Sequence, residues 1–134
     1  MKKLIIYTDG GARGNPGPAA IGAVIGEKQY GEAIGKATNN VAEYRAIIFA
    51  LKKAKALVGS DAAGETEIEL RSDSELIVNQ LNGRFKIKDA DLQPLFIEVW
   101  NAKQDYGRVS FVHVPREENT KADALVNKAL DTLL

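Results

Sequence analysis

The stretch that decides the fold is residues 7–18, Tyr7-Thr8-Asp9-Gly10-Gly11-Ala12-Arg13-Gly14-Asn15-Pro16-Gly17-Pro18. An apolar run, residues 4–7, delivers the carboxylate of Asp9 into a segment with few side chains. Four glycines within residues 10–17 permit positive φ angles and remove the Cβ atoms that would keep a bulky ligand away. The stretch therefore predicts a strand that ends in a glycine-rich turn or in a loop that a ligand approaches. It is not a phosphate-binding P-loop, because no Gly-Lys-Ser/Thr follows.

The composition describes one domain over residues 1–134, long enough to bury a core without a covalent staple. There is no cysteine, which excludes disulfides and thiolate metal sites. The apolar runs are too short to span a membrane, and the start of the chain does not have the pattern of a signal peptide. We expect a cytoplasmic monomer with no membrane partner. Eighteen basic and eighteen acidic residues give zero net charge, so no strong overall field attracts a polyanion.

The first half of the chain predicts three strands and a long helix. Residues 3–9 are nearly all apolar and predict a central strand that is covered on both faces. Residues 19–26 and 29–36 predict an antiparallel hairpin. Thr38-Asn39-Asn40 offers caps for a helix over residues 41–58, whose apolar stripe runs from Glu43 through Ile47, Leu51, Ala54 and Leu57.

The second half alternates strands with helices. Residues 59–64 predict a polar loop, and residues 67–72 a half-buried strand that Asp73 ends. Helices follow over residues 74–81 and from Asp91, which we expect to cap a helix with Pro94 in its first turn. The buried face of that helix is predicted to be Leu95, Phe96, Val99 and Trp100. After a strand at residues 108–114, a helix capped by Asn119 or Thr120 is predicted to turn inward Ala122, Leu125, Val126, Ala129, Leu130 and Leu133.

Four carboxylates, Asp9, Glu43, Asp73 and Asp123, stand at strand ends or in the first turns of helices. Singly, each has a structural explanation: Glu43 and Asp123 would favour a helix N-terminus and Asp73 would be an N-cap. Such ends meet at one edge of an α/β sheet, where binding sites are built. Carboxylates brought together repel unless cations neutralise them, and oxygen ligands without thiolates indicate Mg²⁺ or Mn²⁺.

The motifs that carry these residues resemble those of type 1 ribonuclease H. They are Thr8-Asp9-Gly10-Gly11 with Gly14-Asn15-Pro16-Gly17-Pro18, then Thr38-Asn39-Asn40-Val41-Ala42-Glu43, Ser72-Asp73-Ser74 and Asn119-Thr120-Lys121-Ala122-Asp123. The likeness runs over nearly the whole chain in the family's order. It implies the ribonuclease H-like α/β fold, a five-stranded mixed sheet with its first three strands antiparallel and with flanking helices.

The resemblance also implies an activity and a set of site residues. The activity would be endonucleolytic hydrolysis of the RNA strand of RNA–DNA hybrids by two Mg²⁺ ions per site, with Mn²⁺ as a substitute, leaving 5′-phosphate and 3′-hydroxyl ends. Double-stranded RNA stays open as a second substrate, and a non-catalytic nucleic-acid-binding or scaffolding domain of the same fold is the alternative. The metal-binding carboxylates would be Asp9, Glu43, Asp73 and Asp123; Gly10, Asn15, Asn39 and Asn40 would contact the minor groove, and Thr38 a phosphate.

Two departures from the family pattern affect what we expect. The segment 82–91 is short beside the basic protrusion of some members, and we see no separate hybrid-binding domain, so we expect modest substrate affinity. The connection at residues 114–119 is tight where many members carry a mobile loop with a histidine, and it resembles the variant of archaeal-type and reverse-transcriptase-like members. Counted back from Asp123, His113 has the spacing of that histidine; followed along the strand, it is a fixed side chain, which is the interpretation we favour.

Overall fold

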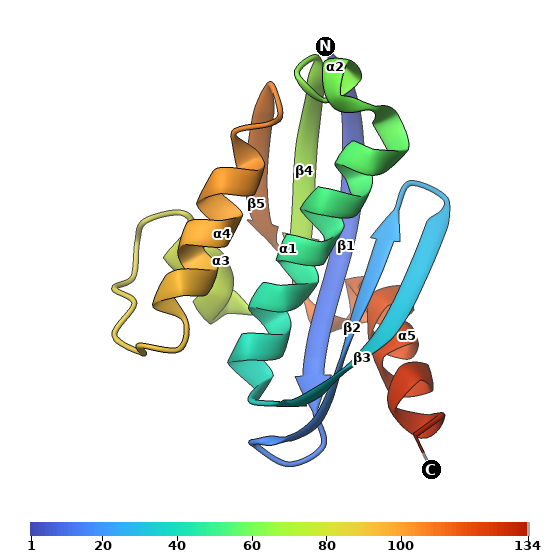
Figure 1. Cartoon of the computed structure of the whole chain (residues 1–134), viewed down its shortest axis with the longest axis vertical. Coiled ribbons are helices and arrows are strands. Elements are labelled where there is room, and N and C mark those ends of the chain that lie inside the picture. Colours follow the sequence, from blue (N-terminus) through green and yellow to red (C-terminus); the bar gives the residue numbers. More distant parts are fainter. Residues whose placement is uncertain (134) are drawn as a thin grey trace.

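The computed structural model of the chain describes residues 1–133. Within them, one mixed five-stranded sheet has the order β3-β2-β1-β4-β5 (Figure 1). β1, β2 and β3 pair antiparallel, and β4 and β5 run parallel to β1. The predicted fold class is therefore confirmed. The strands are β1 (Lys2–Ala12), β2 (Gly17–Ile25), β3 (Lys28–Ala37), β4 (Thr66–Ser72) and β5 (Arg108–His113).

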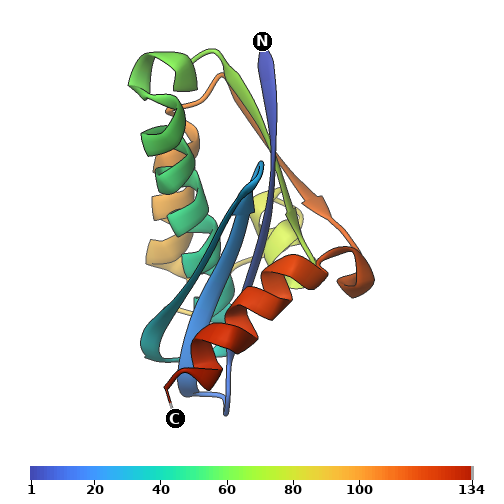
Figure 2. The same ribbon diagram turned by 90° about the vertical axis from the view of Figure 1, so that its right-hand side faces the viewer.

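Helices cover the two faces of the sheet unequally. α1 packs on β1 and β2 and against α4, whereas among the helices of residues 1–133 only α5 lies on the opposite face, over β2, β3 and part of β1 (Figure 2). None of the helices in this part of the chain is long and apolar enough to cross a membrane. The helices are α1 (Asn39–Val58), α2 (Ser60–Ala63), α3 (Glu75–Leu81), α4 (Gln93–Lys103) and α5 (Thr120–Asp131), with a 3₁₀ turn η1 (Arg116–Glu118) before α5.

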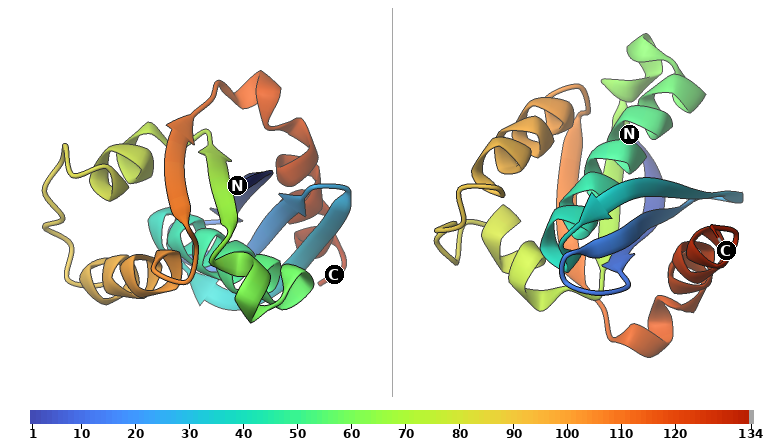
Figure 3. Two further views of the ribbon diagram at one scale, coloured as in Figure 1. Left: turned by 90° about the horizontal axis from the view of Figure 1, so that it is seen from above. Right: turned by 60° about the horizontal axis from the view of Figure 1, so that its bottom comes forward.

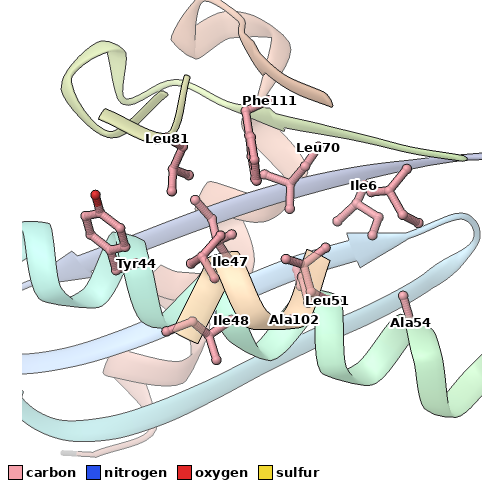
Figure 4. Close-up of a cluster of buried hydrophobic side chains, with 14 of the residues drawn as sticks. Ile6, Tyr44, Ile47, Ile48, Leu51, Ala54, Leu70, Leu81, Ala102 and Phe111 are labelled. Carbon is pink, nitrogen blue, oxygen red and sulfur yellow. The ribbon is translucent and has the colours of Figure 1, made fainter. Parts of the chain in front are cut away.

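The core lies between α1 and the sheet. Side chains of Ile47 and Leu51 on α1 meet strand residues such as Ile6 and Leu70 (Figure 4). Alanines recur every four residues along α1 and are fully buried, which lets the helix axis approach the strands closely. The predicted stripe is correct as far as Ala54, but Leu57, in the last turn, is 42% exposed. The recurring alanines are Ala42, Ala46, Ala50 and Ala54.

The apolar sequence of the central strand predicted that helices would cover both of its faces, and this prediction was wrong. Ile5 is 37% exposed, because α5 reaches only the carboxyl-terminal part of β1. A layer of charged side chains lies on the open face instead. The carboxylate of Glu69 forms ion pairs with Lys3 at 2.9 Å and with Arg71 at 2.6 Å. These charged side chains cover a face of the sheet that helices would bury in a fully parallel sheet.

Three local predictions around α2 and α4 were wrong. The segment 59–64 is not a loop throughout, because it contains α2, whose Ala63 is buried. Asp91 does not cap α4; the preceding turn is built on Asp89, whose side chain accepts a hydrogen bond from the Asp91 N–H at 2.8 Å. Trp100 is 50% exposed, since Val99 and Ala102 take the inward positions of the helix.

The inward face predicted for α5 is confirmed except at its last residue, and Leu125 and Ala129 belong to it as half-buried side chains. Ala122, Val126 and Leu130 are buried against the sheet, whereas Leu133 lies beyond the end of α5 and is 55% exposed. Glycines on the strands beneath it, Gly22 and Gly31, let α5 lie close to the sheet.

Candidate active site

The predicted carboxylates lie at the end of the sheet where β1 and β4 finish. One oxygen from each of Asp9, Glu43 and Asp73 lies within 4.8 Å of the other two. Asp123, in the first turn of α5, lines the same pocket but is exposed and stands outside this set of three. The right-hand view of Figure 3 turns this end of the molecule toward the reader. The structure thus brings three carboxylates into a cluster and adds the fourth at its edge.

Glu43 reaches the cluster because α1 lies against the backbone of β1 at Gly10. A Cβ atom at Gly10 would overlap the carbonyl group of Ala42 and lie 2.5 Å from the backbone nitrogen of Glu43. Glu43 lies past the first turn of α1 and is buried, so its position is not that of a residue that interacts with the helix N-terminus. Gly10 therefore has a structural role, whereas the resemblance had implied only a contact with the substrate.

Asp73 is free of the capping role that the sequence allowed. The N-cap of α3 is Ser74, whose hydroxyl accepts a hydrogen bond from the N–H of Ile77 at 3.3 Å. The N–H of Ser74 in turn donates to the hydroxyl of Ser72 at 3.1 Å. Asp73 thus sits in a turn that its two serine neighbours hold, and its own carboxylate faces the pocket.

Asp123 is positioned by the docking of α5. The buried side chain of Asn119, at the start of α5, donates a hydrogen bond to the carbonyl oxygen of Thr8 at 2.8 Å. Asn119 makes no side-chain cap, so its role is to anchor the helix next to Asp9. A Cβ atom at Gly22 would overlap the carbonyl oxygen of Ala122, so this glycine lets α5 lie directly on β2. The motif at residues 119–123 contains Asn119 and Ala122, but neither contact could be predicted from it.

The electrostatics of the cluster favour a bound cation. Burial, followed by the charges of Asp73 and Asp123, raises the pKa of Asp9 from 3.8 to about 7. Burial and then the neighbouring Asp9 raise the pKa of Glu43 well above its usual value. The Glu43 oxygen Oε2 is buried without a hydrogen-bond partner among residues 1–133. An acceptor left unpaired in this way is costly unless a cation or a proton satisfies it.

The pocket around the cluster has a volume of about 450 Å³ and contains more than acidic groups. Arg13 and Arg116 bring two cationic side chains to its wall, and Asn127 adds an amide. Arg116 comes from η1, a segment that the sequence interpretation treated only as a connection. The sequence signal for Arg116 is a basic residue that closely follows the end of a predicted strand. This signal is weak by itself, because only the folded structure shows that η1 lies beside the carboxylate pocket.

The amides predicted to bind substrate are held by the protein itself. The Asn39 side-chain oxygen accepts the N–H of Ala12 at 2.9 Å, and that of Asn15 accepts the N–H of Asn39 at 3.0 Å. Both amide oxygens are thus occupied, and neither Nδ2 group has a hydrogen-bond partner within the described chain. The hydroxyl of Thr38 caps α1 by accepting the N–H of Val41 at 3.2 Å. Asn40 lines the pocket with Asn39.

His113 pairs with Ser72, the residue before Asp73, but its side chain does not line the carboxylate pocket. It ends β5 and lines a separate groove of about 460 Å³ beside α3, together with residues such as Asn79 and Arg84. It is not among the residues that line the pocket of Asp9. The fixed strand position is therefore the one that the structure adopts.

The strand order and the acidic cluster define an α/β domain of the ribonuclease H-like fold. The family model described as reverse transcriptase-like matches residues 7–129. The chain is 46% identical to LC11-RNase H1, isolated from compost by a metagenomic approach, and the two structures have a TM-score of 0.92 with 99% of each chain covered. A second structure of that protein, in complex with an RNA/DNA hybrid, gives a TM-score of 0.91 over 97% of this chain and 98% of that one, at 45% identity.

The chain is also similar to curated proteins over nearly all of its length. The chain is 44% identical to a ribonuclease HI of Halobacterium salinarum, with 93% of this chain and 63% of the relative covered. It is 43% identical to a bifunctional protein of Mycobacterium tuberculosis over 96% of this chain. It spans only 36% of the length of that mycobacterial relative. The chain belongs to the type 1 ribonuclease H family.

Proposed function

We propose that this chain is an endoribonuclease that hydrolyses the RNA strand of RNA–DNA hybrids with the help of divalent metal ions. The observation that carries the proposal is the cluster of the buried Asp9 and Glu43 with the half-buried Asp73, each of which offers an oxygen within 4.8 Å of the other two. LC11-RNase H1, which is bound to such a hybrid in its own structure, supports the same substrate for this chain. The products are expected to carry 5′-phosphate and 3′-hydroxyl ends.

The residues of the cluster suit Mg²⁺ or Mn²⁺. Their donors are all carboxylate oxygens, which these hard cations prefer, and the unpartnered Oε2 of Glu43 offers a ligand that nothing else in the described chain uses. Asp9, Glu43 and Asp73 would hold two ions with Asp123 at the edge of the site. When bound, such a pair of ions supplies activation of the attacking water and stabilisation of the leaving oxygen.

The chain's own part in the reaction is to bind and align the hybrid. Asn15 and Asn39 use their amide oxygens internally, which leaves their Nδ2 groups available to acceptors outside the protein. Acceptors of that kind are the base edges in the minor groove and the ribose 2′-hydroxyls, which distinguish RNA from DNA. Arg116 brings positive charge beside the acidic cluster, where the phosphate backbone must approach. Arg13 lines the same pocket, but its guanidinium already pairs with Asp131 at 2.6 Å.

The non-catalytic alternative explains less. A domain that only bound nucleic acid would gain nothing from buried carboxylates that raise one another's pKa and repel a polyanion. The same cluster is what metal-assisted phosphodiester hydrolysis requires.

The test is a cleavage assay with labelled RNA–DNA hybrid, RNA duplex and DNA duplex, each with Mg²⁺, Mn²⁺ or chelator. We expect cleavage only of the RNA strand of the hybrid, dependent on metal, with the RNA duplex as the open case. Asp73→Asn should abolish it, whereas Asp61→Asn, the same change at an exposed site on α2, should not. Cleavage that persists in chelator, or equal cutting of DNA duplex, would falsify the proposal.

A further inference from the structure

Asp123 is the least constrained of the four carboxylates. Asp9 and Glu43 are buried and Asp73 is half-buried, whereas Asp123 is exposed on the surface of α5. An exposed aspartate samples several rotamers, and ordering it for metal binding costs conformational entropy. A contact that fixes its carboxylate would therefore improve the site without touching the metal.

Asn127, one turn further along α5, makes such a contact. Its Nδ2 group donates to the backbone carbonyl of Asp123 at 3.1 Å and to the carboxylate oxygen Oδ2 of Asp123 at 3.3 Å. Residues four apart on a helix face each other, so the geometry needs no distortion of α5. Both residues line the carboxylate pocket. Asparagine is also a poorer helix former than alanine, so helix propensity does not account for its presence.

We propose that Asn127 is a positioning residue that holds Oδ2 of Asp123 and leaves the other carboxylate oxygen to the metal site. This inference rests on the proposed function, because it assigns Asp123 to the metal site. Residues beyond the direct ligands commonly act in this way, by fixing the orientation of a ligand.

The competing explanation is a local helix contact with no role in the site. α3 contains a matched case, since Nδ2 of Asn79 donates to the carbonyl of Glu75, four residues earlier, at 2.9 Å. Within residues 1–133 the Asn79 side chain makes no hydrogen bond to a carboxylate, and its oxygen accepts a hydrogen bond from the Arg84 guanidinium. Asn79→Ala therefore removes the same kind of backbone contact and leaves the acidic cluster alone.

The experiment compares Asn127→Ala, Asn127→Gln and Asn79→Ala by Mn²⁺ binding in a calorimeter and by the Mn²⁺ concentration that gives half-maximal cleavage. Asn127→Ala should weaken Mn²⁺ binding about tenfold, the low end for a residue that orients a ligand. The KM for hybrid at saturating Mn²⁺ should not change. Asn127→Gln, which keeps an amide donor one turn from Asp123, should restore part of the loss. Asn79→Ala should bind Mn²⁺ like the unmodified protein.

A double mutant decides whether Asn127 acts through Asp123. In an Asp123→Ala background, Asn127→Ala should cause no further loss of Mn²⁺ affinity. An equal loss in both backgrounds, or an equal loss in Asn79→Ala, would overturn the inference. If the unmodified protein binds Mn²⁺ but does not cleave hybrid, the proposed function fails, while the calorimetric comparison still tests Asn127.

Discussion

Gly10 of β1 lies so close to Ala42 of α1 that a single methyl group would not fit between them. The contact sets the distance from the central strand to the first long helix, and through that distance it sets the separation of Asp9 from Glu43. Protein interiors do not yield by such amounts without a shift of backbone. The glycine is therefore part of the structure of the site, even if it also contacts substrate.

Gly10→Ala should destabilise the protein, because overpacking of this kind costs about 1–3 kcal/mol. It should also lower activity, since α1 must move and carry Glu43 with it. Thermal melts and cleavage rates measure the two effects. Gly11→Ala is the matched control, because a Cβ there would meet only Cγ1 of Val126 at an ordinary 3.6 Å. Equal melting temperatures for the two variants would show that the close approach has no energetic weight.

Asp9→Asn should leave the metal-free protein at least as stable at neutral pH, because it removes a buried charge from a repulsive cluster. The pKa of Asp9 is raised from 3.8 to about 7 in the folded protein. The folded state therefore binds a proton more tightly than the unfolded state does. Its contribution to stability is complete below pH 4 and is lost as the pH rises toward 7.

The measurement is the melting temperature of the two metal-free proteins from pH 4 to pH 8. The difference between Asp9→Asn and the unmodified protein should shift in favour of the variant as the pH rises. Added Mg²⁺ should stabilise the unmodified protein more than the variant. A large drop in melting temperature for Asp9→Asn at every pH would instead mark Asp9 as a structural residue.

The sequence was sufficient for the fold because its signals were local and agreed with one another. The apolar run before Asp9, the hairpin and the capped helix after Thr38 each predicted an element that forms. The predictions failed where the burial of a side chain depends on residues that are distant in the sequence or on competing positions of the same helix. Trp100 was predicted to share the buried face of α4 with Val99, but Val99 and Ala102 take the inward positions. The open face of β1 carries charged pairs with β4, which no local pattern of β1 could reveal.

For the site, the sequence supplied the residues but not their roles. It placed Asp9, Glu43 and Asp73 at one edge, and those three do converge. It could not show that Asp123 stands apart from them, or that Asn119 anchors α5 to Thr8 from 111 residues away in sequence. Long-range contacts of that kind depend on the closed fold.

Hybrid binding should be weak, and its dependence on salt shallow. The chain has zero net charge, so few counterions are released when it covers the phosphate backbone. Binding can be measured in Ca²⁺, which should permit binding without turnover, across a series of salt concentrations. A slope that corresponds to about eight or more phosphate contacts would contradict this expectation.

His113→Ala should reduce single-turnover cleavage by about tenfold or less, whereas loss of a proton-transfer group costs on the order of 10²- to 10⁴-fold. The reason is position: His113 lines the groove beside α3, and the cation that the connection after β5 brings to the carboxylate pocket is Arg116. Arg116→Ala should therefore weaken hybrid binding, by about tenfold or more if it pairs with a phosphate. Arg108→Ala, which removes an exposed arginine from the other end of β5, is the charge-matched control and should have little effect. Single-turnover rates at saturating enzyme, with circular dichroism to verify folding, separate these outcomes. A loss beyond about a hundredfold for His113→Ala would make it a catalytic residue after all.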